Sequence, residues 1–78
     1  DNSSAVFEEL AVVRASLAAA HGMPPFALCP ERTLQLIAAA LPRSGSAMLS
    51  ISGVTPQGVA AYGEAFLRVI AKGLAKNS

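Results

Sequence analysis

Residues that build catalytic, metal and disulfide sites are scarce in this sequence. Its 78 residues include one cysteine and one histidine, so no internal disulfide can form. Cys29 and His21 have no partner nearby in the sequence for a metal site, and the serines have no histidine in a recognisable triad arrangement. We therefore expect no catalytic residue, no metal and no cofactor. A binding function is much better supported by the sequence than an enzymatic one.

Charge and long apolar runs are also in short supply. Charged residues make up 14% of the chain and the net charge is +1, whereas dedicated polyanion-binding proteins carry a pronounced basic excess. No apolar run approaches the roughly 20 residues that span a bilayer, and the N-terminus lacks the basic start and apolar core of a signal peptide. With the single cysteine, these absences predict a soluble cytoplasmic protein without a membrane partner.

Alanine and other apolar residues dominate what is present. The hydrophobic fraction is 53% and the aromatic fraction 5%, which favours closely packed helices and leaves little material for a deep cleft. A chain of this length makes one domain, residues 1–78, which buries only about 60% of its unfolded surface. Because no strand-like alternation is present, we predict an all-α, monomeric bundle of about five helices.

The first half of the chain predicts two helices and an extended connection. A tail of residues 1–4 ends in a cap at Ser3 or Ser4, and the first helix runs to about Ala20. Its core side is Val6, Leu10, Val13 and Leu17, and its solvent side is Glu8, Glu9 and Arg14. Two prolines keep residues 23–28 extended, with Phe26 and Leu28 pinned to the core. Pro30 opens the second helix, whose buried stripe before Pro42 is Leu34, Ile37, Ala38 and Leu41.

The second half contains a glycine hairpin between helices. Ser44 is expected to cap a short helix through Leu49, and Gly53 to form the turn after it. Thr55 caps the next helix, and Pro56 fits its first position because the missing N–H would have no partner there. We expect helices over residues 56–61 and 62–76, with the chain either bending at Gly63 or running on. Residues 77–78 form a tail.

The order and spacing of several short motifs resemble one domain family. They are Gly22-Met23-Pro24-Pro25-Phe26, Thr33-Leu34, Pro42-Arg43-Ser44, Leu49-Ser50-Ile51-Ser52-Gly53-Val54 and Tyr62-Gly63-Glu64-Ala65-Phe66-Leu67-Arg68-Val69-Ile70. Together they are similar to the HRDC (helicase and RNase D C-terminal) domain from about residue 10 to residue 70. The last motif and the Gly-x-Pro-Pro-aromatic run look more like RecQ-type DNA helicases than RNase D.

The resemblance implies a compact helical domain without catalytic activity, attached to an ATP-dependent 3′-to-5′ DNA helicase of recombination and repair. Some members of the family bind single-stranded or junction DNA weakly, and others contact the helicase core or other repair proteins. The parent protein would be cytoplasmic and associated with the nucleoid. No phosphate-loop motif of a helicase motor is present in this chain.

This sequence departs from the family pattern at the hairpin. The family commonly has Gly-Val-Gly, then proline and a lysine two residues on, whereas here Thr55 replaces the second glycine and Gly58 the lysine. An uncharged residue thus takes the place of a phosphate-pairing one. Cys29 stands where the family often has an aromatic residue, and Glu31 takes a position that is often aspartate.

The candidate nucleic-acid contacts are a basic line and the hairpin. Arg68, Lys72 and Lys76 are four residues apart on the last predicted helix, and Arg43 could extend this line. The hairpin Gly53, Val54 and Thr55 could offer backbone amides to a phosphate at a helix N-terminus. The alternative is a solvated face with Glu64 pairing Arg68, beside an ordinary turn.

The second hypothesis is a protein-interaction domain. Met23, Pro24, Pro25 and Phe26 could form an exposed apolar patch for a partner such as the helicase core or another repair protein. Tyr62 could stack on a base, although packing between helices is the more common role of such a residue. Cys29 is expected to be a small buried residue.

Overall fold

The computed structural model describes the backbone of residues 2–76 and the side chains of residues 4–74. Over this range the chain is helical and forms no strand, which confirms the all-α prediction. The elements are α1 (Asn2–Ala20), α2 (Pro25–Leu28), α3 (Glu31–Ala40), α4 (Gly45–Leu49), α5 (Pro56–Gly58), the π-helical segment η1 (Val59–Gly63) and α6 (Glu64–Lys76).

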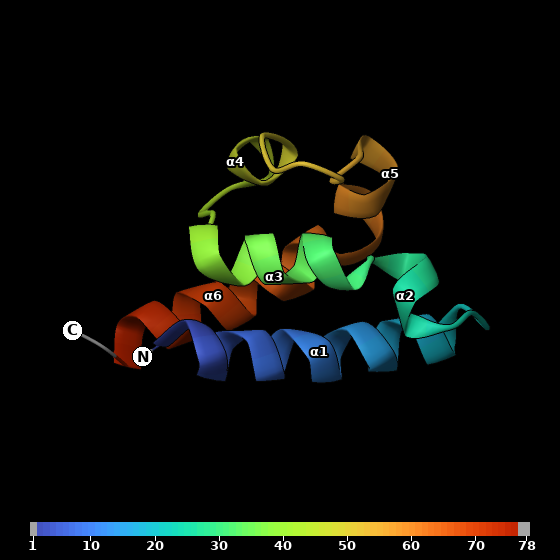
Figure 1. Cartoon of the computed structure of the whole chain (residues 1–78), viewed down its shortest axis with the longest axis horizontal. Helices are drawn as coiled ribbons and strands as arrows, with labels where there is room; N and C mark the ends of the chain where they lie inside the picture. Colours follow the sequence, from blue (N-terminus) through green and yellow to red (C-terminus); the bar gives the residue numbers. More distant parts are fainter. Residues whose placement is uncertain (1, 77–78) are drawn as a thin grey trace.

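Three longer helices enclose the core. Helix α1 packs on α3 and on α6, and Figure 1 shows α1 along the bottom of the view, α3 above it, and α4 and α5 at the top. Each long helix contributes fully buried side chains, among them Leu10, Leu34, Ile37, Phe66 and Ile70. These residues lie on the apolar stripes that the helical spacing predicts, because one face of each helix must leave water.

Helix α1 begins earlier than expected. The backbone is helical from Asn2, so the predicted tail is wrong for residues 2–4 and Ser4 lies in the first helical turn. The side chain of Ser3 lies outside the described residues, as do residue 1 and residues 77–78. Asn2 through Ser4 contain no proline or glycine that would prevent the helix from extending into them.

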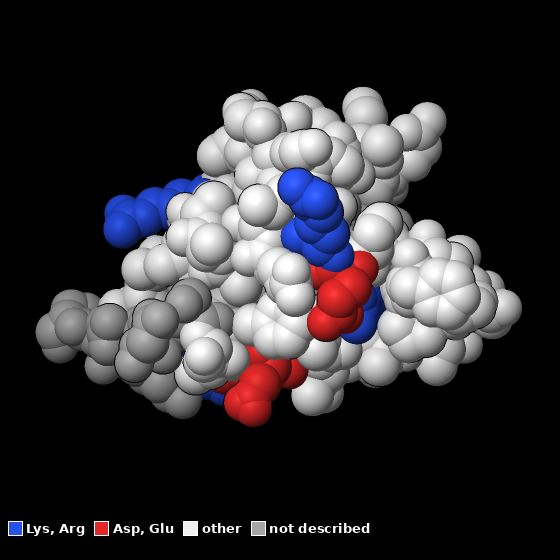
Figure 2. All heavy atoms as spheres, viewed as in Figure 1, with Lys and Arg blue, Asp and Glu red and all other residues white. Residues whose placement is uncertain are grey.

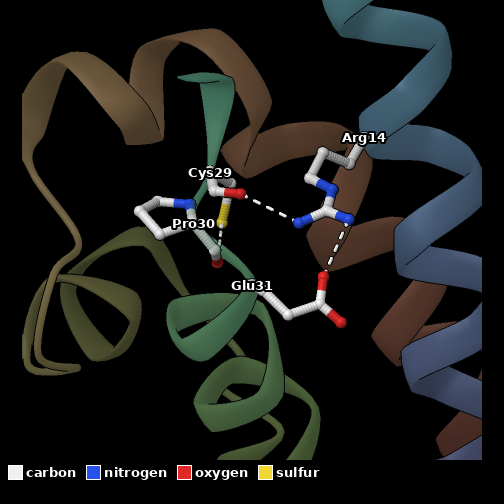
Figure 3. Close-up of polar contacts among 4 residues, drawn as sticks. All are labelled: Arg14, Cys29, Pro30 and Glu31. Atoms are coloured by element: carbon white, nitrogen blue, oxygen red, sulfur yellow. Dashed lines mark hydrogen bonds and ion pairs between the residues drawn. The ribbon is translucent and has the colours of Figure 1, made fainter. Parts of the chain in front are cut away.

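Arg14 does not face solvent, contrary to the prediction. Its side chain is 11% exposed and crosses from α1 to the chain that joins α2 to α3 (Figure 3). There Nη1 donates to the carbonyl oxygen of Cys29 at 3.0 Å, and Nη2 donates to Oε1 of Glu31 at 3.0 Å. Since α1 and α3 pack together, the guanidinium replaces water as the partner of a backbone carbonyl and of a carboxylate.

Replacing Arg14 with methionine should lower the free energy of unfolding by about 1–3 kcal/mol. The variant leaves the carbonyl of Cys29 without this donor, and a buried acceptor without a partner costs about that much. The exposed cation Arg68 supplies the control, because Arg68→Met should cost no more than about 1 kcal/mol. Urea unfolding followed by circular dichroism measures both, and equal losses in the two variants would contradict a tertiary role for Arg14.

Helix α2 corrects the predicted extended connection. Pro25 is the first residue of a one-turn helix, because proline is well suited to a position where no N–H is needed. Leu28 packs against the core as predicted, but Phe26 does not, since 68% of its surface is exposed. Cys29, directly after the helix, is fully buried as expected.

Helices α3 and α4 follow the sequence prediction closely. Leu34, Ile37 and Ala38 are buried, and α3 ends with Leu41 in the left-handed conformation (φ 51°) before Pro42. Leu41 itself is only partly buried. Ser44 caps α4 by accepting a hydrogen bond from the N–H of Ala47 at 3.1 Å.

From Pro56 to Lys76 the helix runs on without a break. The two helices predicted there are one continuous element, in which α5 passes through η1 into α6. A π-helical segment inserts extra backbone into a helix and widens it locally. At Gly63 an added Cβ would lie 2.9 Å from Cγ1 of Val59, so the side chain of Val59 leaves no room for a larger residue in this turn. Of the two alternatives at Gly63, a bend or a continuous helix, the structure has the continuous helix, widened locally by η1.

Candidate nucleic-acid interface

An open groove lies beside the π-helical segment. Eight residues line it, and its volume is about 620 Å³: Arg43, Val59, Ala60, Gly63, Glu64, Leu67, Arg68 and Ala71. We call it the η1–α6 groove. Its floor is apolar and mostly made of small side chains from η1 and α6, while its charged groups are two arginines and one glutamate.

The groove brings together two of the predicted phosphate contacts. Arg43 follows the turn at Pro42, and Arg68 lies in the second turn of α6, so 25 positions separate them in the sequence. The loop between α3 and α4 places the first arginine, and helix α6 places the second. Arg43 makes no salt bridge to the residues that the structure describes.

The other basic residues of the predicted line have different surroundings. Arg68 Nη2 lies 2.7 Å from Oε1 of Glu64, and both side chains are mostly exposed at 78% and 82%. This pair confirms the ion pair expected for a solvated face. Lys72 does not line the groove, and its Nζ lies 3.8 Å from Oε2 of Glu9 on α1. Lys76 continues α6, but its side chain lies outside the described residues.

The charges do not form a continuous basic surface on the face drawn in Figure 2. Lys and Arg side chains touch Asp and Glu side chains near the centre of this face, and much of the remaining surface is uncharged. Three of the five Lys and Arg side chains that the structure describes are in salt bridges: Arg14, Arg68 and Lys72. These ion pairs reduce the positive charge that this face could present to a polyanion.

The hairpin has the predicted backbone conformation but lies outside the groove. Gly53 has φ of 90°, and Thr55 Oγ1 accepts a hydrogen bond from the N–H of Gly58 at 3.0 Å. The N–H of Val54 bonds to Ile51, and Pro56 has no N–H to offer. Gly53, Val54 and Thr55 do not line the η1–α6 groove.

Thr33 is the residue of this region that sequence reasoning missed. It is buried in α3 beneath the hairpin, and its Oγ1 donates to the carbonyl oxygen of Ser52 at 3.5 Å. The same oxygen lies against Gly53 so closely that a Cβ there would overlap it. The signal was present in the Thr33-Leu34 motif, but a threonine among helical residues does not by itself indicate its distant partner.

Tyr62 packs in the core, so its ring is not available to stack on a base. Only 2% of its surface is exposed, and its ring centroid lies 4.6 Å from that of Phe66. Burial raises the pKa of Tyr62 to about 12, with the nearby Cys29 thiol as a further cause. Burial likewise raises the pKa of Cys29 above its usual value.

The predicted partner patch lies at the α2 end of the molecule. Met23, Pro24, Pro25 and Phe26 are all exposed, and Phe26 is the most exposed aromatic residue of the described chain. Residues 15–30 contain no Lys, Arg, Asp or Glu. On the face drawn in Figure 2, the end of the molecule where α2 lies shows no charged side chain.

Two further findings concern other classes of site. Among the residues that the structure describes, no three His, Cys, Asp or Glu side chains gather as a metal ion would require. In the same part of the chain, no helix has the length and hydropathy to cross a membrane.

Comparison with known proteins identifies the family. The HRDC domain model matches residues 3–70. The chain is 40% identical over 65 residues to the ATP-dependent DNA helicase RecQ of Bacillus subtilis (strain 168), an alignment that covers 83% of this chain and 11% of the helicase. No solved structure matches the fold significantly. The motif order, the all-α fold and these matches together show that the chain belongs to the HRDC domain family.

Proposed function

We propose that this chain is a non-catalytic auxiliary domain of a RecQ-like, ATP-dependent 3′-to-5′ DNA helicase, and that it contacts DNA phosphates weakly. The observation that carries the proposal is the meeting of Arg43 and Arg68 in the η1–α6 groove. Two guanidinium groups from separate segments can hold neighbouring phosphates of one strand, since each presents several N–H donors in a plane. The remainder of the groove is apolar and brings no further charge except Glu64.

The charge of the groove indicates how strong this contact is. If two phosphates of a single strand are neutralised, log affinity falls with log salt with a slope of about −1.4. Raising the salt from about 30 to 150 mM then weakens binding about tenfold. Such an interaction would act on DNA that the helicase motor already holds, where the local concentration is high. The domain would thereby tune which DNA structures the motor engages.

Removing either groove arginine should weaken DNA binding about three- to tenfold at low salt, because each supplies one of two phosphate contacts. The measurement is fluorescence anisotropy of labelled single-stranded, duplex and forked DNA with Arg43→Gln and Arg68→Gln. Arg32→Gln is the matched control, since Arg32 is exposed on α3, outside the groove, and makes no salt bridge to the described residues. Equal weakening by all three variants would argue for nonspecific attraction, and the absence of any binding by the wild type would refute the proposal.

A second candidate function is docking on the helicase core or another repair protein. The observation in its favour is the exposed Phe26 beside Met23, in a segment (residues 15–30) that contains no Lys, Arg, Asp or Glu. A substitution Phe26→Ser should then weaken that protein contact and leave DNA affinity within about twofold. Loss of DNA affinity without loss of the protein contact would rule this candidate out.

A further inference from the structure

We infer that Glu64 limits the nucleic-acid affinity of the η1–α6 groove by holding Arg68 in an ion pair that an incoming phosphate must replace. This inference rests on the proposed function, because it concerns the regulation of the same groove. The low affinity of the groove for nucleic acid would then be due to this one carboxylate, and not only to the small net charge of the whole chain.

The geometry places the competitor inside the groove. Glu64 is the first residue of α6, directly after η1, and it lines the groove together with both arginines. Its Oε1 lies 2.7 Å from Nη2 of Arg68 one helical turn later. A phosphate that approaches the groove therefore finds Arg43 without a carboxylate partner among the described side chains, but Arg68 already bound to one. It also approaches the negative charge of Glu64 itself.

The charge of the groove shows why one residue can matter. The lining residues carry two positive charges and one negative charge, so their net charge is +1 and would become +2 without Glu64. Removing Glu64 also frees the Arg68 guanidinium for a charge-assisted hydrogen bond to phosphate. The Glu64–Arg68 pair is exposed and contributes little to the stability of the fold. Substitution of Glu64 therefore changes binding without unfolding the domain.

The chain offers a matched control for the loss of one negative charge. Glu8 is exposed and lines a different groove, between α1 and α3, with Phe7 and Gln35 among its neighbours. Glu9 and Glu31 are less suitable because each is in a salt bridge, with Lys72 and Arg14 respectively. Glu8→Gln changes the net charge of the protein as much as Glu64→Gln does, but it leaves the groove intact.

The test compares single-stranded DNA binding of the wild type, Glu64→Gln, Glu8→Gln, Arg68→Gln and the double variant Glu64→Gln/Arg68→Gln. Anisotropy at several salt concentrations gives affinities and salt slopes. Glu64→Gln should tighten binding three- to tenfold while the slope stays near about −1.4, because both arginines still contact a phosphate and only the competing carboxylate is lost. Glu8→Gln should tighten it less than twofold. In the Arg68→Gln background the effect of Glu64→Gln should also fall to about twofold, because its main target is gone.

Each result decides between the alternatives. Equal gains from Glu64→Gln and Glu8→Gln would overturn the role of Glu64, and the proposed function would stand if Arg43→Gln still weakened binding. Binding that is tighter in Glu64→Gln than in the wild type, and weak again in the double variant, would support the inference. No binding by any variant would overturn both the inference and the proposed function.

Discussion

Replacing Gly53 with alanine should lower the free energy of unfolding by about 3 kcal/mol, because two separate costs add at this position. The first is conformational, since Gly53 has φ of 90°, where an L-residue with a Cβ is strained. The second is steric, since the new Cβ would overlap Oγ1 of the buried Thr33. Urea unfolding of the variant measures the sum of the two costs.

A control glycine and a double-mutant cycle separate these costs. Gly22 also has a positive φ, of 68°, but a Cβ there would meet no atom within 4 Å, so Gly22→Ala should cost only about 1 kcal/mol. In a Thr33→Ala background the atom nearest to the Cβ at position 53 is a Cβ at 3.4 Å, and Gly53→Ala should then cost about 1–2 kcal/mol less. In a Thr33→Val background a methyl group takes the place of Oγ1, so Gly53→Ala should have the same cost as in the wild type. The same cost of Gly53→Ala in all three backgrounds would show that Thr33 does not hold the hairpin.

The stability of the domain should fall as the pH rises from about 10 to 12, because of Tyr62. Burial raises the pKa of this residue from 10.0 to about 12, so the folded protein keeps the phenol proton after the unfolded chain has lost it. Over that range the unfolded state binds fewer protons, and stability therefore decreases with pH. Two pKa units correspond to about 2–3 kcal/mol, which is fully present below pH 10 and lost above pH 12.

The composition of the chain makes this measurement direct. Tyr62 is the only tyrosine and there is no tryptophan, so the absorbance of tyrosinate reports this one side chain. Its midpoint should lie near 12 in the folded protein and near 10 in urea. Tyr62→Phe should remove this contribution to the alkaline loss of stability, so the difference between the two proteins isolates the effect of the phenol. A folded-state midpoint near 10 would contradict the burial of the phenol.

The sequence predicted most of the local structure correctly because these features depend on neighbours in the chain. The caps at Ser44 and Thr55 each join a side chain to an amide three residues later. The turn at Gly53 and the first helical position of Pro56 depend on backbone conformation alone. The buried stripe of α3 follows from helical spacing, and the motif order indicates the HRDC family that the family model matches.

Predictions that depended on distant partners were less successful. Arg14 was expected to face water and is largely buried, because the start of α3 packs across it. Phe26 was expected to reach the core and is exposed, because Pro25 begins a helix whose other side carries the contact through Leu28. In both cases periodicity indicates a side of a helix, but only packing determines whether that side is covered.

The sequence by itself determined the fold class, the family, the caps and the absence of an internal disulfide, since these follow from composition and from contacts within a few residues. The tertiary structure alone decided that Arg43 and Arg68 line one groove and that the hairpin amides do not join them. It also decided that Thr33 lies under Gly53, 20 positions away in the sequence. The reason is physical: these juxtapositions arise from how whole helices pack to bury apolar surface, a global balance that no short segment of the chain records.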